Sequence, residues 1–183
     1  MAFEEVTLSR DVEVVMIPQG VPTTLKAGTP AVITQSLGDS YTLQVPSFGG
    51  LYRLSGANAD AIGKAAGSGD AKAEVDPNAQ VAEDQIYAEL RQVYDPEIPV
   101  NIVELGLVYD LAIEKLETGG SKVAVKMTLT APGCGMGDII ADDAKRRIAT
   151  IPGVADADVQ VVFDPPWNQS MMSEAAKLEL GML

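Results

Sequence analysis

A change in composition near the middle of the chain limits what it can fold into. Residues 57–75 are dominated by small and polar side chains and include Gly67-Ser68-Gly69. Such a stretch offers little apolar surface for a core, and it is typical of a linker. The 183 residues are enough for one domain or for two small ones. We therefore predict a small domain over residues 1–56, a flexible linker over 57–75 and a second domain over 76–183.

Short apolar segments separated by Gly and Pro characterise the N-terminal piece. They cover residues 12–17, 21–25, 31–34, 41–45 and 50–54. Short strands at this spacing predict a small all-β, barrel-like domain. This piece carries no phosphate loop, no metal-ligand spacing and no pair of carboxylates, so we expect a structural or docking role for it.

The C-terminal piece alternates between the helical and the strand period. A helix is expected from Asp76-Pro77 to Asp95, because Pro suits the first helical position and Pro96 disfavours helical geometry in the residue before it. The expected order is α-β-β-α-β-α, with strands over 107–113, 123–129 and 159–163 and further helices over 138–150 and 173–180. The sequence thus predicts an α+β fold, with helices packed on a small mixed sheet.

Charge and composition exclude several classes of function. The formal charge is −13, from 13 basic and 26 acidic residues, so nucleic acid and anionic membranes are unsuitable partners. One Cys and no His exclude an intrachain disulfide, a Cys–His or Ser–His–Asp catalytic group and a four-ligand Cys/His zinc site within the chain. No leader or membrane segment is recognisable, and unpaired cysteine usage favours the cytoplasm.

The single cysteine, Cys134, lies in a Gly-rich loop between a strand and a helix. Glycines such as Gly133 and Gly135 leave the backbone open to close approach by a ligand. A helix N-terminus also favours the thiolate. Against this stands the ordinary role of a lone cysteine as a small buried apolar residue. Position alone leaves a reactive and an inert Cys134 about equally favoured.

Two more loops carry candidate side chains. Prolines stiffen the segment that displays Asp95 and Glu97, whose carboxylates could bind a proton or a metal, or could simply cap a turn and face solvent. Trp167 follows two prolines, and it covers the core or anchors a partner. Met171 and Met172 are core residues or contact residues. Whether the Cys134 loop meets the Trp167 loop depends on whether their strands run in the same direction, which the sequence leaves open.

Three sequence blocks together resemble the MIP-type (PaaD-like) iron–sulfur assembly family. The blocks are Asp95 to Tyr109, Met127 to Cys134, and Asp164 to Trp167 with Met172-Ser173. The β extension is similar to that of SufT-type members. The resemblance implies an accessory factor in iron–sulfur cluster maturation that works with assembly proteins and apo-client proteins of the SUF system.

Residue roles follow from the same resemblance. Cys134 matches the motif cysteine and would be a transient ligand of iron or of an iron–sulfur cluster. The supporting loop residues are Asp95, Glu97, Thr130, Pro132, Gly133 and Gly135, and the candidate partner contacts are Trp167, Met171 and Met172. Many relatives have Pro after the cysteine where this chain has Gly135, so we expect a more mobile loop here.

Three functional hypotheses remain at this point. The first is the non-enzymatic maturation factor. The second is a protein-binding adaptor in which Cys134 is structural. The third, a thiol enzyme, is the weakest, because the chain has no His to serve as a base. One thiol per chain cannot complete a cluster, so a second molecule must contribute, and we expect a homodimer or a higher form.

Overall fold

The computed structural model describes residues 4–38, 40–66, 79–95, 97–131 and 135–182. The chain divides into two compact units, Met1–Asp70 and Ala71–Leu183, which are considered separately below. The fold is α+β, with a six-stranded antiparallel sheet in the first unit and a three-stranded mixed sheet in the second. No helix in the described ranges has both the length and the apolar character needed to cross a membrane.

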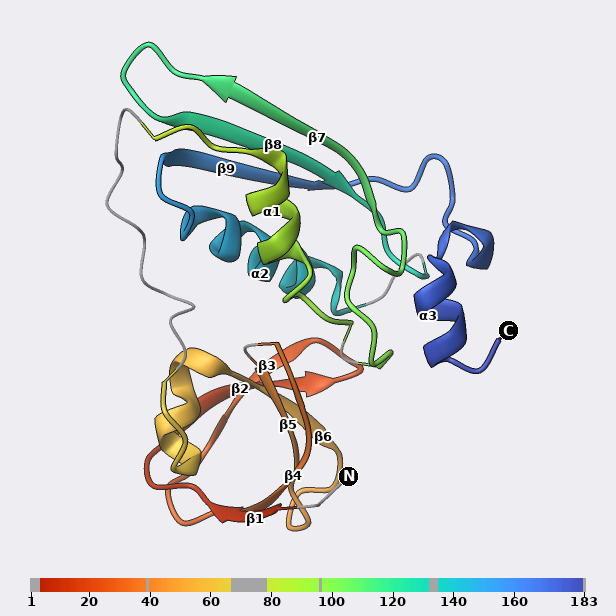
Figure 1. Cartoon of the computed structure of the whole chain (residues 1–183). Coiled ribbons are helices and arrows are strands. Elements are labelled where there is room, and N and C mark those ends of the chain that lie inside the picture. The colour runs from red at the N-terminus through yellow and green to blue at the C-terminus, as the bar shows by residue number, and fades with distance from the viewer. Residues whose placement is uncertain (1–3, 39, 67–78, 96, 132–134, 183) are drawn as a thin grey trace. The chain divides into compact units, whose positions relative to one another are not determined.

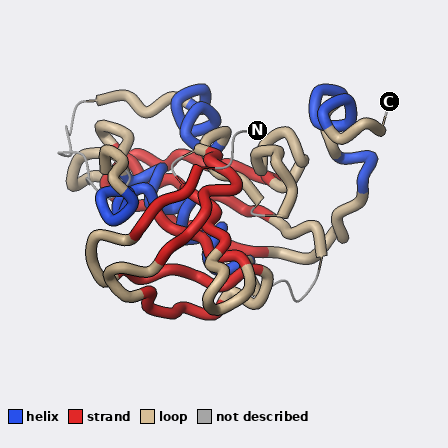
Figure 2. Tube along the Cα trace, turned by 90° about the horizontal axis from the view of Figure 1, so that it is seen from below, coloured by secondary structure: helices blue, strands red, loops and turns tan. Residues whose placement is uncertain are grey.

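The first unit is a curled antiparallel sheet in the order β1-β4-β5-β6-β2-β3. Figures 1 and 2 show its strands curving around a common interior. All five strands that the sequence predicts are present, and β1 is an additional one. The strands are β1 (Glu4–Thr7), β2 (Val12–Ile17), β3 (Val21–Leu25), β4 (Pro30–Leu37), β5 (Ser40–Gln44) and β6 (Leu51–Ser55).

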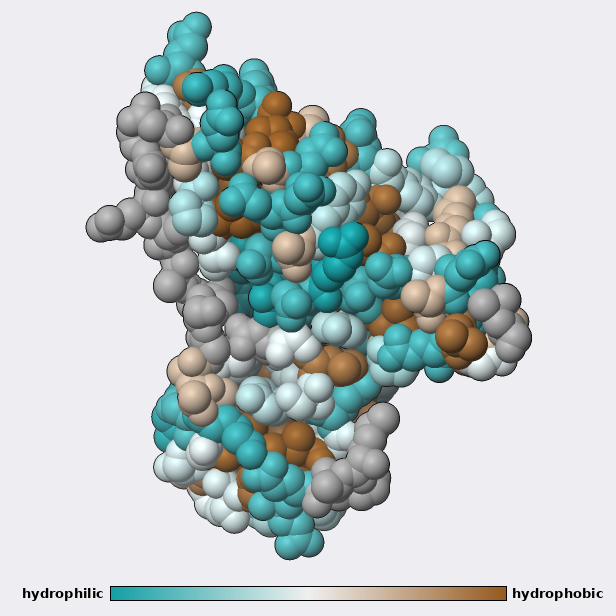
Figure 3. Space-filling view, in the orientation of Figure 1, coloured by the Kyte–Doolittle hydropathy of each residue, from teal (hydrophilic) through white to brown (hydrophobic). Residues whose placement is uncertain are grey.

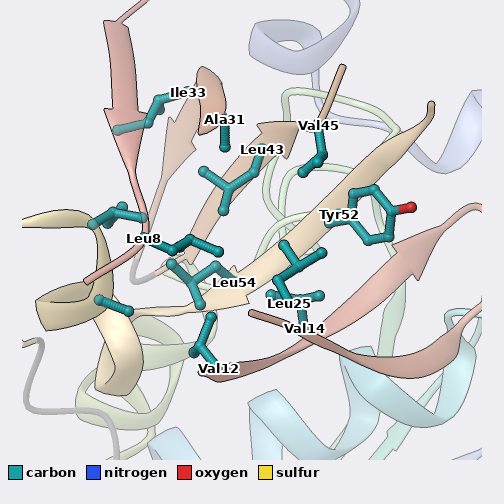
Figure 4. Packing of buried hydrophobic residues seen from close by; sticks show 12 residues of the cluster. Leu8, Val12, Val14, Leu25, Ala31, Ile33, Leu43, Val45, Tyr52 and Leu54 are labelled. Carbon is teal, nitrogen blue, oxygen red and sulfur yellow. The ribbon is translucent and has the colours of Figure 1, made fainter. Parts of the chain in front are cut away.

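Alternating side chains of these strands fill the interior of the sheet. On β2, Val12 and Val14 are buried while Glu13 between them is exposed, as expected for a strand with one solvated face. Figure 4 shows these two residues meeting side chains from the other strands. Leu43 and Leu54 are completely buried at the centre of this cluster. The first unit therefore has a hydrophobic core of its own.

The structure differs from the predicted linker over residues 57–62. Gly56–Ile62 form a 3-10 helix, η1, whose Ala61 and Ile62 join the core of the first unit. The N–H of Ser9 donates to the carbonyl of Ala61 (2.8 Å), and Arg10 pairs with Asp60 (2.7 Å). A run of small residues is typical of a linker, but here the small side chains allow η1 to pack closely against the core of the first unit. Residues 67–75 of the predicted linker lie outside the described residues.

The second unit follows the predicted order of elements. It contains α1 (Glu83–Leu90), β7 (Val108–Lys115), β8 (Ser121–Met127), α2 (Gly137–Ala149), β9 (Val154–Val161), the short 3-10 helix η2 (Gln169–Met171) and α3 (Glu174–Glu179). The sheet order is β7-β8-β9, and β7 is antiparallel to β8 whereas β9 is parallel to it. Figure 1 shows α1 and α2 on one face of this sheet.

Helix α1 is shorter than the sequence predicts. Residues 76–78, where its start was expected, lie outside the described residues, and the helix begins only at Glu83. The backbone N–H of Ala82 donates to Oε1 of Gln85 (3.0 Å), which caps the first turn. Ala79, which precedes the helix in the chain, lies close to Gly153. A Cβ built on Gly153 would lie 2.8 Å from the Cβ of Ala79. This segment is therefore an extended strap rather than a first helical turn.

The other face of the small sheet is polar. Lys126 pairs with Asp110 (3.6 Å) on β7, and Lys122 pairs with Asp156 (3.8 Å) on β9. Opposite charges on neighbouring strands stabilise a solvated sheet face only modestly. On the side drawn in Figure 3, apolar side chains form small groups separated by hydrophilic ones.

Because η1 contributes to the core, Ile62→Ala should destabilise the first unit. Ile62 is 4% exposed, and removing a buried Ile side chain to Cβ costs about 2–5 kcal/mol. Val21→Ala is the matched control, since Val21 is 52% exposed, and it should change the unfolding free energy by less than about 0.5 kcal/mol. Urea unfolding measures both. Equal midpoints for the two variants would show that η1 is not part of the folded unit.

Candidate functional site

The strand directions bring three loops to one edge of the small sheet. β8 and β9 are parallel, so the segments that follow them leave the same edge. β7 is antiparallel to β8, so the segment that precedes it arrives there too. We call the described residues of these three segments, namely 95 and 97–107, 128–131 and 135–136, and 162–173, the loop cluster. The strand direction that the sequence left open is thereby known, because the strands before the Cys134 loop and before the Trp167 loop run in the same direction.

Asp95 organises the first loop. Its side chain is buried, and Oδ1 accepts hydrogen bonds from the backbone N–H groups of Glu97 (2.9 Å) and Ile98 (3.3 Å). This turn leaves the side chain of Glu97 exposed. Burial raises the pKa of Asp95 above its ordinary value. The hydrogen bonds from the two N–H groups lower this pKa, and the nearby negative charge of Glu97 raises it further.

A second turn of the same kind follows at Asn101. Its Oδ1 accepts from the N–H groups of Val103 (3.1 Å) and Glu104 (2.9 Å). Asn101 also forms an isolated bridge with Tyr94, which closes the base of the loop. Two side-chain oxygens thus take the place of regular secondary structure in fixing the loop.

The segment after β9 is fastened to the first loop. The indole N–H of Trp167 donates to the carbonyl of Leu105 (2.8 Å), and the N–H of Ser173 donates to the carbonyl of Glu104 (2.9 Å). Trp167 is half-buried, so it acts as a cover over the first loop.

The two methionines beside Trp167 differ in exposure. Met172 is 6% exposed and packs inside the unit, whereas Met171 is half-buried. The hydroxyl of Tyr109 donates its one hydrogen to the carbonyl of Pro165 (2.9 Å) and lies 3.5 Å from Sδ of Met171. Of the predicted partner contacts, Trp167 and Met171 keep some exposed surface, and Met172 has almost none.

The described parts of the Cys134 loop are held at both ends. A Cβ on Gly137, at the start of α2, would lie 2.4 Å from Cδ1 of Leu129, so these two residues are in close contact. Met136 is fully buried beside them. Between these anchors, Thr130 is half-buried, and Ala131 and Gly135 are exposed. Pro132, Gly133 and Cys134 lie outside the described residues.

Metal-ligating side chains do not gather anywhere in the described part of the chain. Within it, no three His, Cys, Asp or Glu residues lie close enough together to hold a metal ion. Of the predicted site residues that are described, the loop cluster contains Asp95, Glu97, Thr130, Gly135, Trp167, Met171 and Met172. Sequence reasoning missed Asn101 and Tyr109. The position of Asn101 six residues after Asp95, in a segment with two prolines, is a usable signal for a second turn.

Gly106 permits the close approach of the first and third loops. Its φ is +71°, and a Cβ there would lie 2.1 Å from the backbone oxygen of Met171. Gly106→Ala should therefore cost about 1–2 kcal/mol for the left-handed backbone and about 1–3 kcal/mol more for the clash. Gly181→Ala is the control, because Gly181 has a φ of +69° and nothing within 4 Å.

Thermal unfolding of the two glycine variants separates these contributions. The Gly106→Ala variant should melt several degrees below Gly181→Ala. Identical melting temperatures would mean that the third loop does not lie against Gly106.

Asp95 should give the unfolding free energy a recognisable pH dependence. Because its folded pKa is raised, the native state binds more protons than the unfolded state between the ordinary and the raised pKa, so its contribution to stability falls as pH rises through that window. Asp95→Asn keeps the Oδ1 acceptor and removes the charge. Its stability relative to wild type should therefore be greater at pH 7 than at pH 4.

Asp95→Ala is the comparison for the turn itself. It loses both hydrogen bonds and should be destabilised by about 1–2 kcal/mol relative to Asp95→Asn at pH 7. Guanidinium unfolding at a series of pH values measures both effects. A constant difference between wild type and Asp95→Asn from pH 4 to pH 7 would contradict the raised pKa.

Comparison with known proteins identifies relatives of the second unit. The sequence profile of a family described as "Iron-sulfur cluster assembly protein" matches residues 83–161. A Porphyromonas gingivalis protein named "Fe-S protein maturation auxiliary factor" is 45% identical over 101 residues, which cover 55% of this chain and 92% of that protein. A Staphylococcus aureus protein named "Fe-S protein maturation auxiliary factor SufT" is 43% identical over 90 residues, 49% of this chain and 98% of that protein.

A solved structure shows the same similarity. The crystal structure of a domain of unknown function from Bacillus anthracis superimposes with a TM-score of 0.50 at 40% identity, covering 55% of this chain and 92% of that one. The match covers 98% of the S. aureus relative but only 49% of this chain, so about half of this chain has no counterpart in that relative. The profile match lies within the second unit and spans α1 to β9. The chain belongs to the iron–sulfur cluster assembly protein family.

Proposed function

We propose that this protein is an accessory factor in the maturation of iron–sulfur proteins, and that the loop cluster is its working surface. The observation that carries the proposal is the pairing of β8 with antiparallel β7 and parallel β9, which brings the described parts of three separate sequence motifs to one edge of the sheet. Relatives named as maturation factors support the same role. We place the protein in the cytoplasm and assign it no catalytic reaction.

Cys134 is proposed as the residue that holds the cargo for a short time. A thiolate is a good ligand for iron, and exposed Ala131 and Gly135 flank the segment that contains Cys134. Transfer is then a ligand exchange without change of oxidation state. The bond between iron and the Cys134 sulfur breaks as a client cysteine binds the iron, and the proton released by the client thiol protonates the Cys134 thiolate.

A second molecule is required by the number of ligands. The chain has one Cys and no His, so the remaining positions around iron must be filled by a client, an assembly protein, a small thiol or a second copy of the chain. We propose that apo-client and assembly proteins are the partners and that a homodimer supplies two thiolates to one cargo.

The adaptor hypothesis remains the competing function. The second unit has 9 basic and 19 acidic residues between 71 and 183, which suits a basic partner surface. Trp167 and Met171 at the exposed part of the loop cluster would then contact the partner directly, with no role for the thiol. The two functions differ in their dependence on Cys134.

Replacing the thiol tests this difference. The full chain is loaded with iron and sulfide under anaerobic conditions and mixed with an apo-client, and the appearance of client activity is followed over time. Cys134→Ala should slow maturation at least about tenfold, because the chain has no other thiol. Binding of the apo-client, measured separately, should change less than about twofold.

The matched control is the double variant Cys134→Ala with Ala131→Cys. It restores a thiol at an exposed position three residues earlier in the same loop. We expect it to remain slow, because the position of the ligand matters as well as its chemistry. Wild-type maturation by Cys134→Ala would reject the ligand role and favour the adaptor.

A further inference from the structure

Strand β1 lies at one edge of the six-stranded sheet and, among the described strands, pairs only with β4 (Figure 1). The hydrogen-bonding groups of successive residues on an antiparallel strand point in alternating directions. The N–H of Leu8 donates to the carbonyl of Thr29 (3.0 Å), on the β4 side, and Val6 faces β4 by the same alternation. The N–H and C=O groups of Glu5 and Thr7 therefore point to the free edge. Within the described residues, no other backbone group pairs with them.

The pairing of β4 agrees with this direction. Thr7 pairs with Pro30, a residue that has no N–H to donate, so no ladder hydrogen bond is lost there. Glu5 pairs with Val32, whose own backbone groups point to β5. Unpaired groups along an edge strand are a template for a further strand. The other edge strand of the sheet, β3, contains Pro22 and is thereby less suited to strand addition.

A groove of about 400 Å³ adjoins this edge. Strand alternation places Glu5 and Thr7 on the outer face of the sheet, because Val6 between them packs against the core. Their partners Val32 and Pro30 lie on the same face. A side chain of an added strand opposite Thr7 would thus reach an apolar surface. The residues that line the groove are Glu5, Val6, Thr7, Pro30, Ala31, Val32 and Pro46.

Glu5 is the only charged residue among the described residues that line the groove. Its neighbour Glu4 pairs with Lys64 (2.7 Å), whereas Glu5 has no ion-pair partner in the described part of the chain. The whole of β4 is uncharged, so no basic residue of the adjoining strand compensates Glu5. A basic side chain on an added strand would do so. A second copy of β1 would instead bring two more carboxylates to the edge, which disfavours self-pairing.

We propose that the edge of β1 binds an extended segment of a partner protein by strand addition. The segment carries Lys or Arg opposite Glu5 and an aliphatic residue opposite Thr7, two positions away. Backbone hydrogen bonds to Glu5 and Thr7 supply affinity, and the two side chains supply selectivity. This binding surface belongs to the first unit and goes beyond the proposed function, since it does not depend on Cys134.

Two short peptides test the selectivity of the edge. The probe is Thr-Thr-Lys-Thr-Val-Thr-Thr, acetylated and amidated at its ends, and the comparison peptide has Glu in place of Lys. Calorimetric titration into the full chain measures binding. The Lys peptide should bind at least about fivefold more tightly than the Glu peptide at low salt, since like charges repel across a strand pair. Replacing Val by Ser in the Lys peptide should weaken binding at least about threefold.

Charge reversal on the protein tests the role of Glu5. In Glu5→Lys the preference should invert, so that the Glu peptide binds more tightly than the Lys peptide. Glu13→Lys is the matched control, because Glu13 is an exposed residue of β2 in the same unit, and it should keep the preference for the Lys peptide. Cys134→Ala should bind both peptides as wild type does, which separates this inference from the proposed function.

Proline substitutions test the direction of the backbone groups. Thr7→Pro removes an N–H that points to the free edge, whereas Val6→Pro removes one that faces β4. Thr7→Pro should weaken binding of the Lys peptide at least about tenfold, because a strand cannot pair fully with an edge that lacks this donor. Val6→Pro should lower the melting temperature by several degrees more than Thr7→Pro, because it also loses a hydrogen bond of the sheet.

The contrary results are equally definite. No measurable binding of the Lys peptide, equal binding of the two peptides, or a preference for Lys that persists in Glu5→Lys would overturn the inference. Binding to Thr7→Pro as tight as to wild type would reject strand addition. If sedimentation shows a wild-type dimer that Thr7→Pro converts to a monomer, the edge is occupied by a second copy and the inference is wrong.

Discussion

The parallel pairing of β8 with β9 is the interaction on which the rest of the second unit depends. A parallel neighbour requires a crossover, and α2 supplies it across one face of the sheet. Reversing β9 would send the Trp167 segment to the opposite edge, away from Leu105. The hydrogen bond between those two residues is thus a consequence of strand direction. So is the close approach of Gly106 to the backbone of Met171.

Most of the regular elements could be predicted from periodicity. The alternation of Val123, Val125 and Met127 predicts β8, and all three side chains are buried against the helices. The acidic start and basic end of α2 also match the observed helix, with Asp138 in its first turn and Arg146 and Arg147 in its last. These features are local, and tertiary contacts did not override them. Periodicity therefore predicted the helices and strands of the second unit and their order along the chain.

The errors arose where tertiary contacts decide. Alanines over 57–61 have no apolar period, yet η1 packs into a core because its residues are small. Pro77 suits a helix start, but the described strap before Glu83 lies against Gly153 instead. At the candidate site, sequence identified Asp95 and Trp167. It could not give strand direction, nor reveal that Thr128, polar in an alternating strand, is buried.

The contact between Leu129 and Gly137 also bears on how such a protein can change over time. The side chain of Leu129, which precedes the cysteine loop, packs on the backbone of Gly137, which follows it. A Cβ at position 137 would lie 2.4 Å from Cδ1 of Leu129, so a larger residue there would displace a side chain that is only 6% exposed. Descendants of this protein are therefore expected to keep glycine at position 137, whereas the exposed positions 131 and 135 are free to vary.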